Sequence, residues 1–180
     1  DHRGAKVSEL TPVNPQSERA QRRVDAERVL RLWGPAHGIA VTILRVPGIY
    51  AANRLPLERL QSQTPALLPE EDAYSNHIHS DDLARLVCAA VYHGKPQRVI
   101  NACDGNETKM GDYFDEVADA FGLARAPRMP ATQLQEIVSP MLWSFMRESR
   151  RVTNTRLSEL KTPLRYPSVA DFLKTISKNP

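Results

Sequence analysis

The sequence has few cysteines and no long apolar run. Its 180 residues include only Cys88 and Cys103, which form neither a disulfide framework nor a metal-ligand spacing. We therefore expect both to be buried free thiols in a reducing cytoplasm. The most apolar strand-like stretch, residues 39–44, is far too short to cross a bilayer. These absences predict a protein with no membrane span and no membrane partner.

Charge of one sign is not concentrated either. Lysine and arginine total 24 and acidic residues 21, for a net charge of +3. Arginines gather at 19–31 and 147–156, with acidic residues among or near them. Because nucleic-acid binding requires a more one-sided basic stripe, we expect solvated helix faces and no nucleic-acid partner.

Glycine is scarce as well, with eight residues and no Gly-x-x-Gly-x-x-Gly after a strand. The sequence therefore lacks the turn that cradles a dinucleotide pyrophosphate at a helix N-terminus. Residues 1–14 read as an irregular loop that begins without Met, which we interpret as a sign of a fragment or processed product.

Apolar periodicity predicts a first helix and a strand. Asn14 as N-cap and Pro15 at the first helical position would open the helix, which should end at 34–35 or 37–38. Its apolar face is formed by residues spaced i, i+3, i+4 and i+7, namely Ala26, Val29, Leu30 and Trp33. Residues 39–44 follow with apolar side chains on both faces, which predicts a strand of a parallel sheet buried on both sides.

The same spacing predicts further helices, at 81–92, 109–121, 133–147, 153–160 and 168–177. Ser80 or Asp81 can cap the first of these, with Leu83, Leu86, Val87, Ala90 and Val91 on its apolar face. Gly122 should end the second, and Pro140 should kink or break the third. A short strand is predicted at 98–102. Alternating helices and strands indicate an α/β fold, although two long strands are fewer than a doubly wound sheet normally has.

Several segments in this order resemble one protein family. Leu44–Tyr50 reads Leu-Arg-Val-Pro-Gly-Ile-Tyr, and Asn76–Ala84 reads Asn-His-Ile-His-Ser-Asp-Asp-Leu-Ala. Val99–Asp104 is followed by Gly111–Tyr113. Together, across roughly residues 14–175, they resemble the C-terminal portion of the NAD(P)-dependent epimerase/dehydratases, which are extended short-chain dehydrogenases.

The resemblance implies the C-terminal part of a Rossmann-like doubly wound parallel sheet with a small, mostly helical substrate-binding region. The expected units are the end of the Rossmann-like domain (residues 1–50), a substrate-region insertion (51–80), a helix and strand that return to the sheet (81–104), and a helical substrate or cap region (105–180). The resemblance also implies NAD or NADP for the full-length protein, and a nucleotide sugar or other small molecule as substrate. We expect the chain to need its missing N-terminal half or to self-associate, because half of a parallel sheet leaves an apolar edge.

The family's catalytic Tyr and the Lys four residues later align with Arg19 and Arg23. Residues 15–37 contain no Tyr and no Lys, so a shift of one turn does not restore the motif. Arginine keeps its proton at any working pH and cannot act as the acid or base. No catalytic residue is therefore assigned, and this chain alone is expected to be inactive. The alternative hypothesis is a non-catalytic dinucleotide-binding or scaffolding relative.

The resemblance gives candidate binding residues. Those for the cofactor are Arg23, Pro47, Gly48 and Ile49, and those for the substrate are Tyr50, Arg54, Asn76, His79 and Arg151. Several of them have a plainer interpretation: a simple turn at 47–48, a loop charge at Arg54, a solvated helix charge at Arg151, and a helix N-terminus fixed by a hydrogen bond of His79. No metal site is expected, because His77 and His79 would point to opposite sides of an extended segment.

Overall fold

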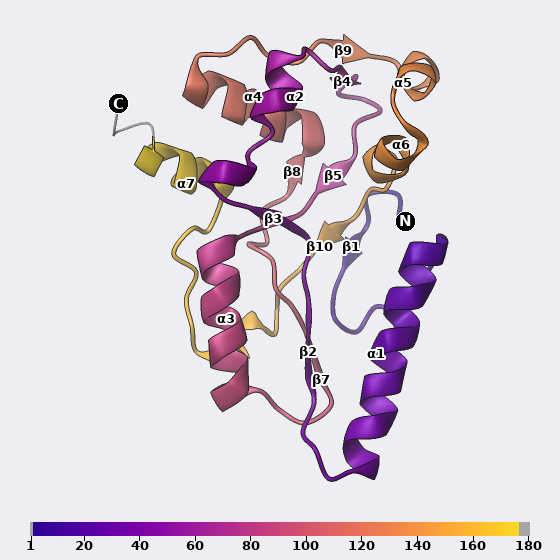
Figure 1. Ribbon diagram of the computed structural model, residues 1–180, viewed down its shortest axis with the longest axis vertical. Helices are drawn as coiled ribbons and strands as arrows, with labels where there is room; N and C mark the ends of the chain where they lie inside the picture. Colours follow the sequence, from indigo (N-terminus) through magenta and orange to yellow (C-terminus); the bar gives the residue numbers. More distant parts are fainter. Residues whose placement is uncertain (1, 177–180) are drawn as a thin grey trace.

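The computed structural model describes residues 2–176. Its helices are α1 (Glu18–Ala36), η1 (Ala52–Arg54), α2 (Leu57–Gln61), α3 (Ser80–His93), α4 (Met110–Phe121), α5 (Ala131–Ile137), α6 (Pro140–Met146), η2 (Leu157–Leu160) and α7 (Val169–Ile176). Its strands are β1 (Lys6–Val7), β2 (Thr42–Arg45), β3 (Gly48–Tyr50), β4 (Ala66–Leu67), β5 (Tyr74–Ser75), β6 (His77–His79), β7 (Arg98–Asn101), β8 (Thr108–Lys109), β9 (Arg128–Met129) and β10 (Arg151–Val152). Figure 1 shows their arrangement.

The strands pair mostly in parallel. The longest pair is β2 with β7, running from Thr42 opposite Arg98 to Arg45 opposite Asn101. Parallel pairs also join β3 to β6, β1 to β10 and β4 to β9, and β5 pairs antiparallel with β8. These parallel pairs, connected through helices, confirm the predicted α/β class.

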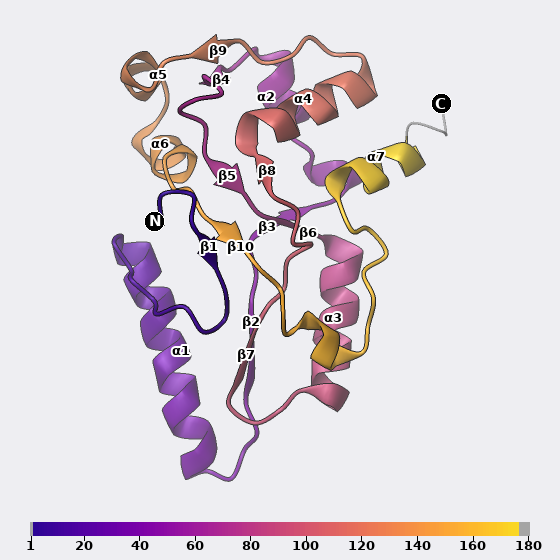
Figure 2. The same cartoon turned by 180° about the vertical axis from the view of Figure 1, so that it is seen from behind.

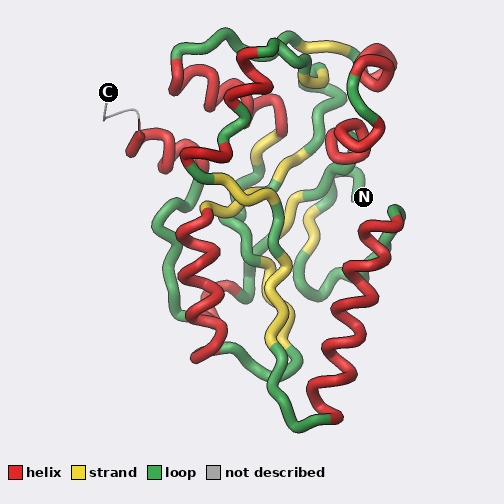
Figure 3. Tube along the Cα trace, viewed as in Figure 1, coloured by secondary structure: helices red, strands yellow, loops and turns green. Residues whose placement is uncertain are grey.

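The β2–β7 pair lies between α1 and α3 (Figures 1 and 3). On the α3 side, Leu86 packs with Ile78 and Ile100 in a buried cluster. On the α1 side, Glu27 accepts two hydrogen bonds from Arg45, at 2.8 and 3.0 Å. Within the described residues β2 pairs only with β7, so its other edge is free.

The cap core lies beyond the carboxyl end of β3, where α2, α4 and α7 pack together. It consists of the buried residues Tyr50, Leu60, Ala66, Tyr113, Phe114, Val117, Ala118, Ala126, Val169, Phe172 and Leu173. Figure 2 shows the chain running from β10 through η2 and past α3 to α7, which brings the C-terminal helix to this core.

The first helix begins later than the sequence predicts. Ser17, not Asn14, is the N-cap, and its hydroxyl accepts a hydrogen bond from the backbone N–H of Ala20 at 3.3 Å. Satisfying that free N–H fixes the helix start, so the prediction of Asn14 was wrong. The predicted end at 37–38 is confirmed, with Gly38 at a φ of +67°.

The apolar face of α1 is uncovered. Val29, Leu30 and Trp33 are 61%, 47% and 45% exposed. The strand β2 is half-buried along its length, so the prediction of burial on both sides was wrong for the described residues. The physical reason is that, within the described residues, no strand pairs with the other edge of β2.

Two predictions for α3 need correction. Its N-cap is His79, whose Nδ1 accepts a hydrogen bond from the backbone N–H of Asp81 at 3.2 Å, rather than Ser80 or Asp81. Leu86 is buried as predicted, but the neighbouring Val87 and Val91 are 49% and 78% exposed. We call α1, β2 and the Val87–Val91 face of α3 the open side of the molecule.

The thiols differ. Cys103 is buried and free as predicted, whereas Cys88 is exposed, so the prediction of burial was wrong for Cys88. Cys88 lies on the exposed surface of α3.

The C-terminal third follows the predicted pattern with smaller deviations. Gly122 caps α4 with a φ of +62°, and the chain breaks before Pro140 into α5 and α6. The helix predicted at 153–160 is shorter, because it begins only at Leu157 and is a 3-10 helix. The loop predicted at 1–14 contains β1, and residue 177 of the last predicted helix lies outside the described residues.

Candidate functional site

The candidate site lies where β2 and β7 end and the chain passes into β3. Pro47 is half-buried, and Gly48 is exposed. The Gly48 backbone N–H donates to the Asn76 carbonyl at 3.1 Å, and a Cβ at position 48 would lie 3.2 Å from the same oxygen. A side chain at this position would crowd the Asn76 carbonyl, so glycine favours the close approach of β6. The exposed side of Gly48 leaves its backbone open to a ligand.

Tyr50 and His79 lie inside the molecule rather than on its surface. Tyr50 is 1% and His79 4% exposed. The Tyr50 hydroxyl donates to the Ser168 carbonyl at 3.3 Å, and burial raises the pKa of this phenol. The His79 ring lies 4.4 and 4.6 Å, centroid to centroid, from the rings of Tyr166 and Phe172. Neither side chain presents a surface to a ligand in this structure.

His79 acts as the plainer interpretation predicts. Its Nδ1 accepts the hydrogen bond that caps α3, so Nε2 carries the proton of the neutral ring. Nε2 is buried without a hydrogen-bond partner among the described residues, and burial lowers the pKa of the imidazole. The ring therefore stays neutral as it caps the helix.

His77 and His79 share one face of β6, which corrects the prediction that they point to opposite sides. Residues i and i+2 of a strand project from the same face. Both rings contact Tyr50, with centroids 6.3 and 5.1 Å from its ring. Burial lowers the pKa of His77 to about 4, and its Nε2 lies 2.9 Å from the Ser75 hydroxyl. In the part of the chain that the structure describes, no group of three or more His, Cys, Asp or Glu side chains is arranged to hold a metal ion.

Asn76 joins β6 to the start of β10. Its amide nitrogen donates to the Arg150 carbonyl at 2.9 Å, and its amide oxygen accepts from the Val152 backbone N–H at 2.8 Å. Both ends of the amide are therefore occupied by the chain itself.

Arg151 and Arg54 are held very differently. Arg151 donates to the Gly4 carbonyl at 2.7 Å, pairs with Glu107 at 3.2 Å and lies over the Tyr74 ring at 5.1 Å. Arg54 ends η1, is exposed, and makes no ion pair or side-chain hydrogen bond with another described residue. Of the two, Arg54 has the guanidinium that is free to meet an anion.

Arg19 and Arg23 lie one turn apart at the start of α1, as predicted. The Arg19 guanidinium lies 3.9 Å from the centre of the Phe145 ring and 3.8 Å from Glu148. Arg23 is exposed and makes no ion pair or side-chain hydrogen bond within the described residues. The two arginines therefore differ: one contacts α6 and the loop after it, and the other is free.

Two buried carboxylates were not singled out from the sequence. Glu9, from the loop after β1, accepts hydrogen bonds from the Asn101 and Arg156 backbone N–H groups and from the Thr155 hydroxyl. Asp104 follows β7, and burial raises its pKa to about 7. A single Glu in a loop gives no sequence signal for such a role, and Asp104 stood out only as the last residue of the segment Val99–Asp104 that resembles the family.

A shallow hollow of about 480 Å³ lies on the outer face of α3, away from the strand ends, and is lined in part by Arg85, Cys88, Tyr92 and Thr162. None of the candidate site residues lines it. Among the described residues, no helix combines the length and apolar character needed to cross a bilayer.

The fold is shared with solved structures. A conserved protein of unknown function from Silicibacter pomeroyi matches 99% of this chain and 61% of its own length, with 28% identity and a TM-score of 0.83. The human epimerase family protein SDR39U1 (isoform 2), solved with NADPH, matches 97% of this chain and 60% of its own length, with 15% identity and a TM-score of 0.73. The chain has the fold of the NAD(P)-dependent epimerase/dehydratases.

A third structure comes from Methylobacillus flagellatus, and its assignment as an NAD-dependent epimerase/dehydratase is itself an inference. It matches 94% of this chain and 56% of its own length, with 26% identity and a TM-score of 0.65. No protein-family model and no curated protein matches the sequence. The chain spans about three fifths of the length of the solved structures it matches.

Two of the candidate cofactor residues have groups that are not engaged by other described residues. The backbone at Gly48 and the free guanidinium of Arg23 provide a close approach and a cation. No pair of the eight glycines forms the pyrophosphate turn, so this sequence offers no cradle for the phosphates. The described residues therefore offer an exposed backbone and a free cation but no glycine turn for the phosphates.

Proposed function

We propose that this chain forms the substrate side of an NAD(P)-dependent oxidoreductase or nucleotide-sugar epimerase/dehydratase, acting in the cytoplasm. The supporting observation is the parallel β2–β7 pair, whose free edge lies between the uncovered apolar faces of α1 and α3. Parallel sheets are normally covered on both faces and extended by further strands. A dinucleotide-binding half, carrying the glycine turn, would add its strands beside β2.

Within this proposal the candidate residues have two roles. Gly48 and Ile49 line the cofactor's nicotinamide end through their backbone, beside Pro47, and Arg23 meets its ribose or phosphate oxygens. Arg54 meets an anionic group of the substrate, because it is exposed and unpaired within the described residues.

The remaining candidates position the site rather than touch the ligand. Tyr50 and His79 are buried against α7, and Asn76 and Arg151 have their polar atoms engaged by backbone groups near β10 and β1. The free buried thiol of Cys103 is consistent with a reducing compartment.

Calorimetric titration of NADH and NADPH into the protein purified from its source, with its intact mass measured first, tests the proposal. Saturable binding of at least one dinucleotide is expected. Arg23→Ala should weaken it by roughly 10- to 100-fold through loss of a charge-assisted hydrogen bond. Arg28→Ala is the matched control, since Arg28 is an exposed arginine of the same helix that pairs with Asp25. Folded protein that binds neither dinucleotide overturns the proposal.

The second candidate function is a non-catalytic dinucleotide-binding or scaffolding relative. The observation that favours it is Arg19, because an arginine engaged with Phe145 and Glu148 takes the place of the family's proton-transferring Tyr. Turnover of the bound cofactor with any sugar nucleotide or carbonyl substrate would eliminate this second candidate.

A further inference from the structure

The start of α1 contacts the segment that follows α6. Arg19 stacks on Phe145, the penultimate residue of α6, and its Nη2 lies 3.8 Å from Glu148 Oε1. Phe145 is 46% exposed and the Arg19 side chain 38% exposed. This contact lies at the surface and can open without disturbing the buried clusters.

The segment that Arg19 touches is where several parts of the chain meet. Glu148 also pairs with Arg150 at 3.1 Å. The Ser149 carbonyl accepts the Gly4 backbone N–H at 2.9 Å, and the Arg150 carbonyl accepts the Asn76 side-chain amide. Because of these hydrogen bonds, holding residues 145–150 in place also positions the chain before β1 and the junction between β5 and β6.

The rest of α1 has little to hold it in the described residues. Its apolar face is exposed, and only Gly34 of its nineteen residues is buried. Ion pairs that reach other elements lie at two places along it: Glu27 binds Arg45 of β2, and Arg19 binds Glu148. Arg19 thus makes the ion pair that joins α1 to the chain around α6, residues 140–150.

Arginine suits this contact for physical reasons. Its guanidinium is flat and permanently charged, so it can stack on an aromatic ring and pair with a carboxylate at once. Lysine is a compact, strongly hydrated point charge and stacks less well.

We propose that Arg19 is a positioning residue that latches the α6 segment, residues 140–150, onto the first turn of α1. All its partners belong to this chain, so the latch does not rest on the proposed function. At position 19 the family resemblance places a proton-transferring Tyr, and this chain has instead an arginine that joins α1 to residues 140–150.

Hydrogen exchange of the protein as isolated, followed by mass spectrometry, tests the latch. Arg19→Ala should speed exchange in residues 140–150 by about fivefold, the factor expected for a half-exposed cation–π and ion-pair contact. Arg19→Lys should give a smaller increase, and so should Glu148→Gln, which keeps the stacking. Arg22→Ala is the matched control, since Arg22 pairs only with Glu18 on the same helix.

Two outcomes overturn the latch. If residues 140–150 exchange as slowly in Arg19→Ala as in Arg22→Ala, the Arg19 contact does not hold this segment in place. Exchange that rises equally in residues 110–121, the buried helix α4, means that Arg19 only contributes to overall stability. Acceleration confined to 140–150 and reduced in Arg19→Lys is the result that the latch requires.

Discussion

Helices α1 and α4 both have apolar residues at helical spacing, but the pattern is much stronger in α4, and the two helices end up in opposite environments. In α4 the residues Tyr113, Phe114 and Val117 are buried in the cap core, whereas Val29, Leu30 and Trp33 of α1 are exposed. Helical spacing identifies the residues that share one face, but whether that face is buried depends on which other helices and strands pack against it. For α4 those elements, α2 and α7, are in this chain.

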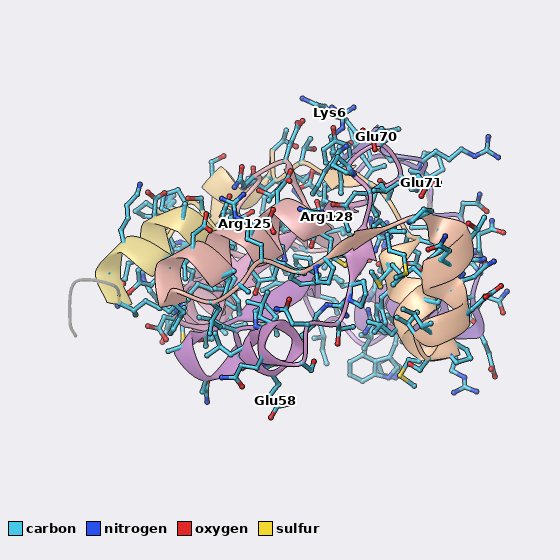
Figure 4. All side chains as sticks on the ribbon, turned by 90° about the horizontal axis from the view of Figure 1, so that it is seen from above. Lys6, Glu58, Glu70, Glu71, Arg125 and Arg128 are labelled. Carbon is cyan, nitrogen blue, oxygen red and sulfur yellow. The ribbon has the colours of Figure 1, made fainter. Side chains whose placement is uncertain are left out.

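The electrostatics of the two regions differ in the same way. Beside the cap core, the carboxylate of Asp82 is buried and accepts hydrogen bonds from backbone groups. Asp82 is 1% exposed and accepts the Arg165 and Tyr166 backbone N–H groups, both at 2.8 Å. On α1, by contrast, the pairs of Arg22 with Glu18 and Arg28 with Asp25 are solvent-exposed and worth little. Figure 4 likewise shows Glu58 of α2 pointing to solvent on the side of the ribbon away from Lys6, Glu70 and Glu71.

The largest expected difference is between matched truncations of the two regions. In the 180-residue polypeptide, Phe114→Ala should lower the free energy of unfolding by about 3–5 kcal/mol, because it empties a buried ring site. Leu30→Ala should change it by less than about 0.5 kcal/mol, because that side chain is already exposed. Urea unfolding followed by circular dichroism measures both. Equal losses would mean that the open side is packed after all.

The next effect is a pH dependence centred on Asp104. Burial raises its folded-state pKa to about 7, so its contribution to stability is full below the unfolded pKa near 4 and is lost as pH rises toward 7. Asp104→Asn keeps the acceptor for the Asn106 N–H and removes this loss. The variant should gain on the order of 3 kcal/mol over the natural protein between pH 4 and pH 8. Unfolding free energies across that range measure the gain, and Asp25→Asn on α1 should show none. A pH-independent difference for Asp104→Asn contradicts the assignment.

A somewhat smaller effect is expected at the N-terminus of α3. Asp82→Ala leaves the part-buried backbone N–H groups of Arg165 and Tyr166 without an acceptor and should cost about 2–3 kcal/mol in unfolding free energy. Asp81→Ala, at the exposed neighbour, should cost less than about 0.5 kcal/mol. Thermal unfolding of the two variants compares them directly. Similar melting temperatures would mean that Asp82 does not anchor residues 165–166.

The smallest of these effects concerns Gly111. A Cβ there would lie 1.5 Å from Arg128 Nη1, and the displaced guanidinium would lose Asp72 and Asp115. Gly111→Ala should cost about 1–3 kcal/mol. In an Arg128→Ala background the same change should cost much less, because the clash is gone. Denaturant unfolding of the four proteins gives the coupling, and additive costs would exclude this clash.

Much of the fold could be predicted from the sequence because its signals are local. The glycine stop at Gly122, the break before Pro140 and the helix end at 37–38 depend on neighbouring backbone groups alone. The N-cap of α1 was misplaced because Asn14 and Ser17 are both good caps, and the choice depends on how the preceding loop packs.

The site was less predictable because the hydrogen bonds and burial of its side chains depend on residues that are distant in the sequence. Asn76 is engaged by residues 150 and 152, and Tyr50 by Ser168, contacts that no spacing reveals. The same holds for Glu9, which is bound by groups more than ninety residues away. Arg19 could be placed beside Arg23 on one helical face from the sequence, but its contact with Phe145 could not.

In the functional protein, we expect a dinucleotide-binding half to cover the open side. Hydroxyl-radical footprinting of the protein as isolated from its source tests this claim most directly. Trp33 is 45% exposed here and Met141, on α6, is 71% exposed. Trp33 should be strongly protected from labelling, while Met141 should be labelled at the rate that its exposure gives. Labelling of both residues in proportion to these exposures would contradict the claim.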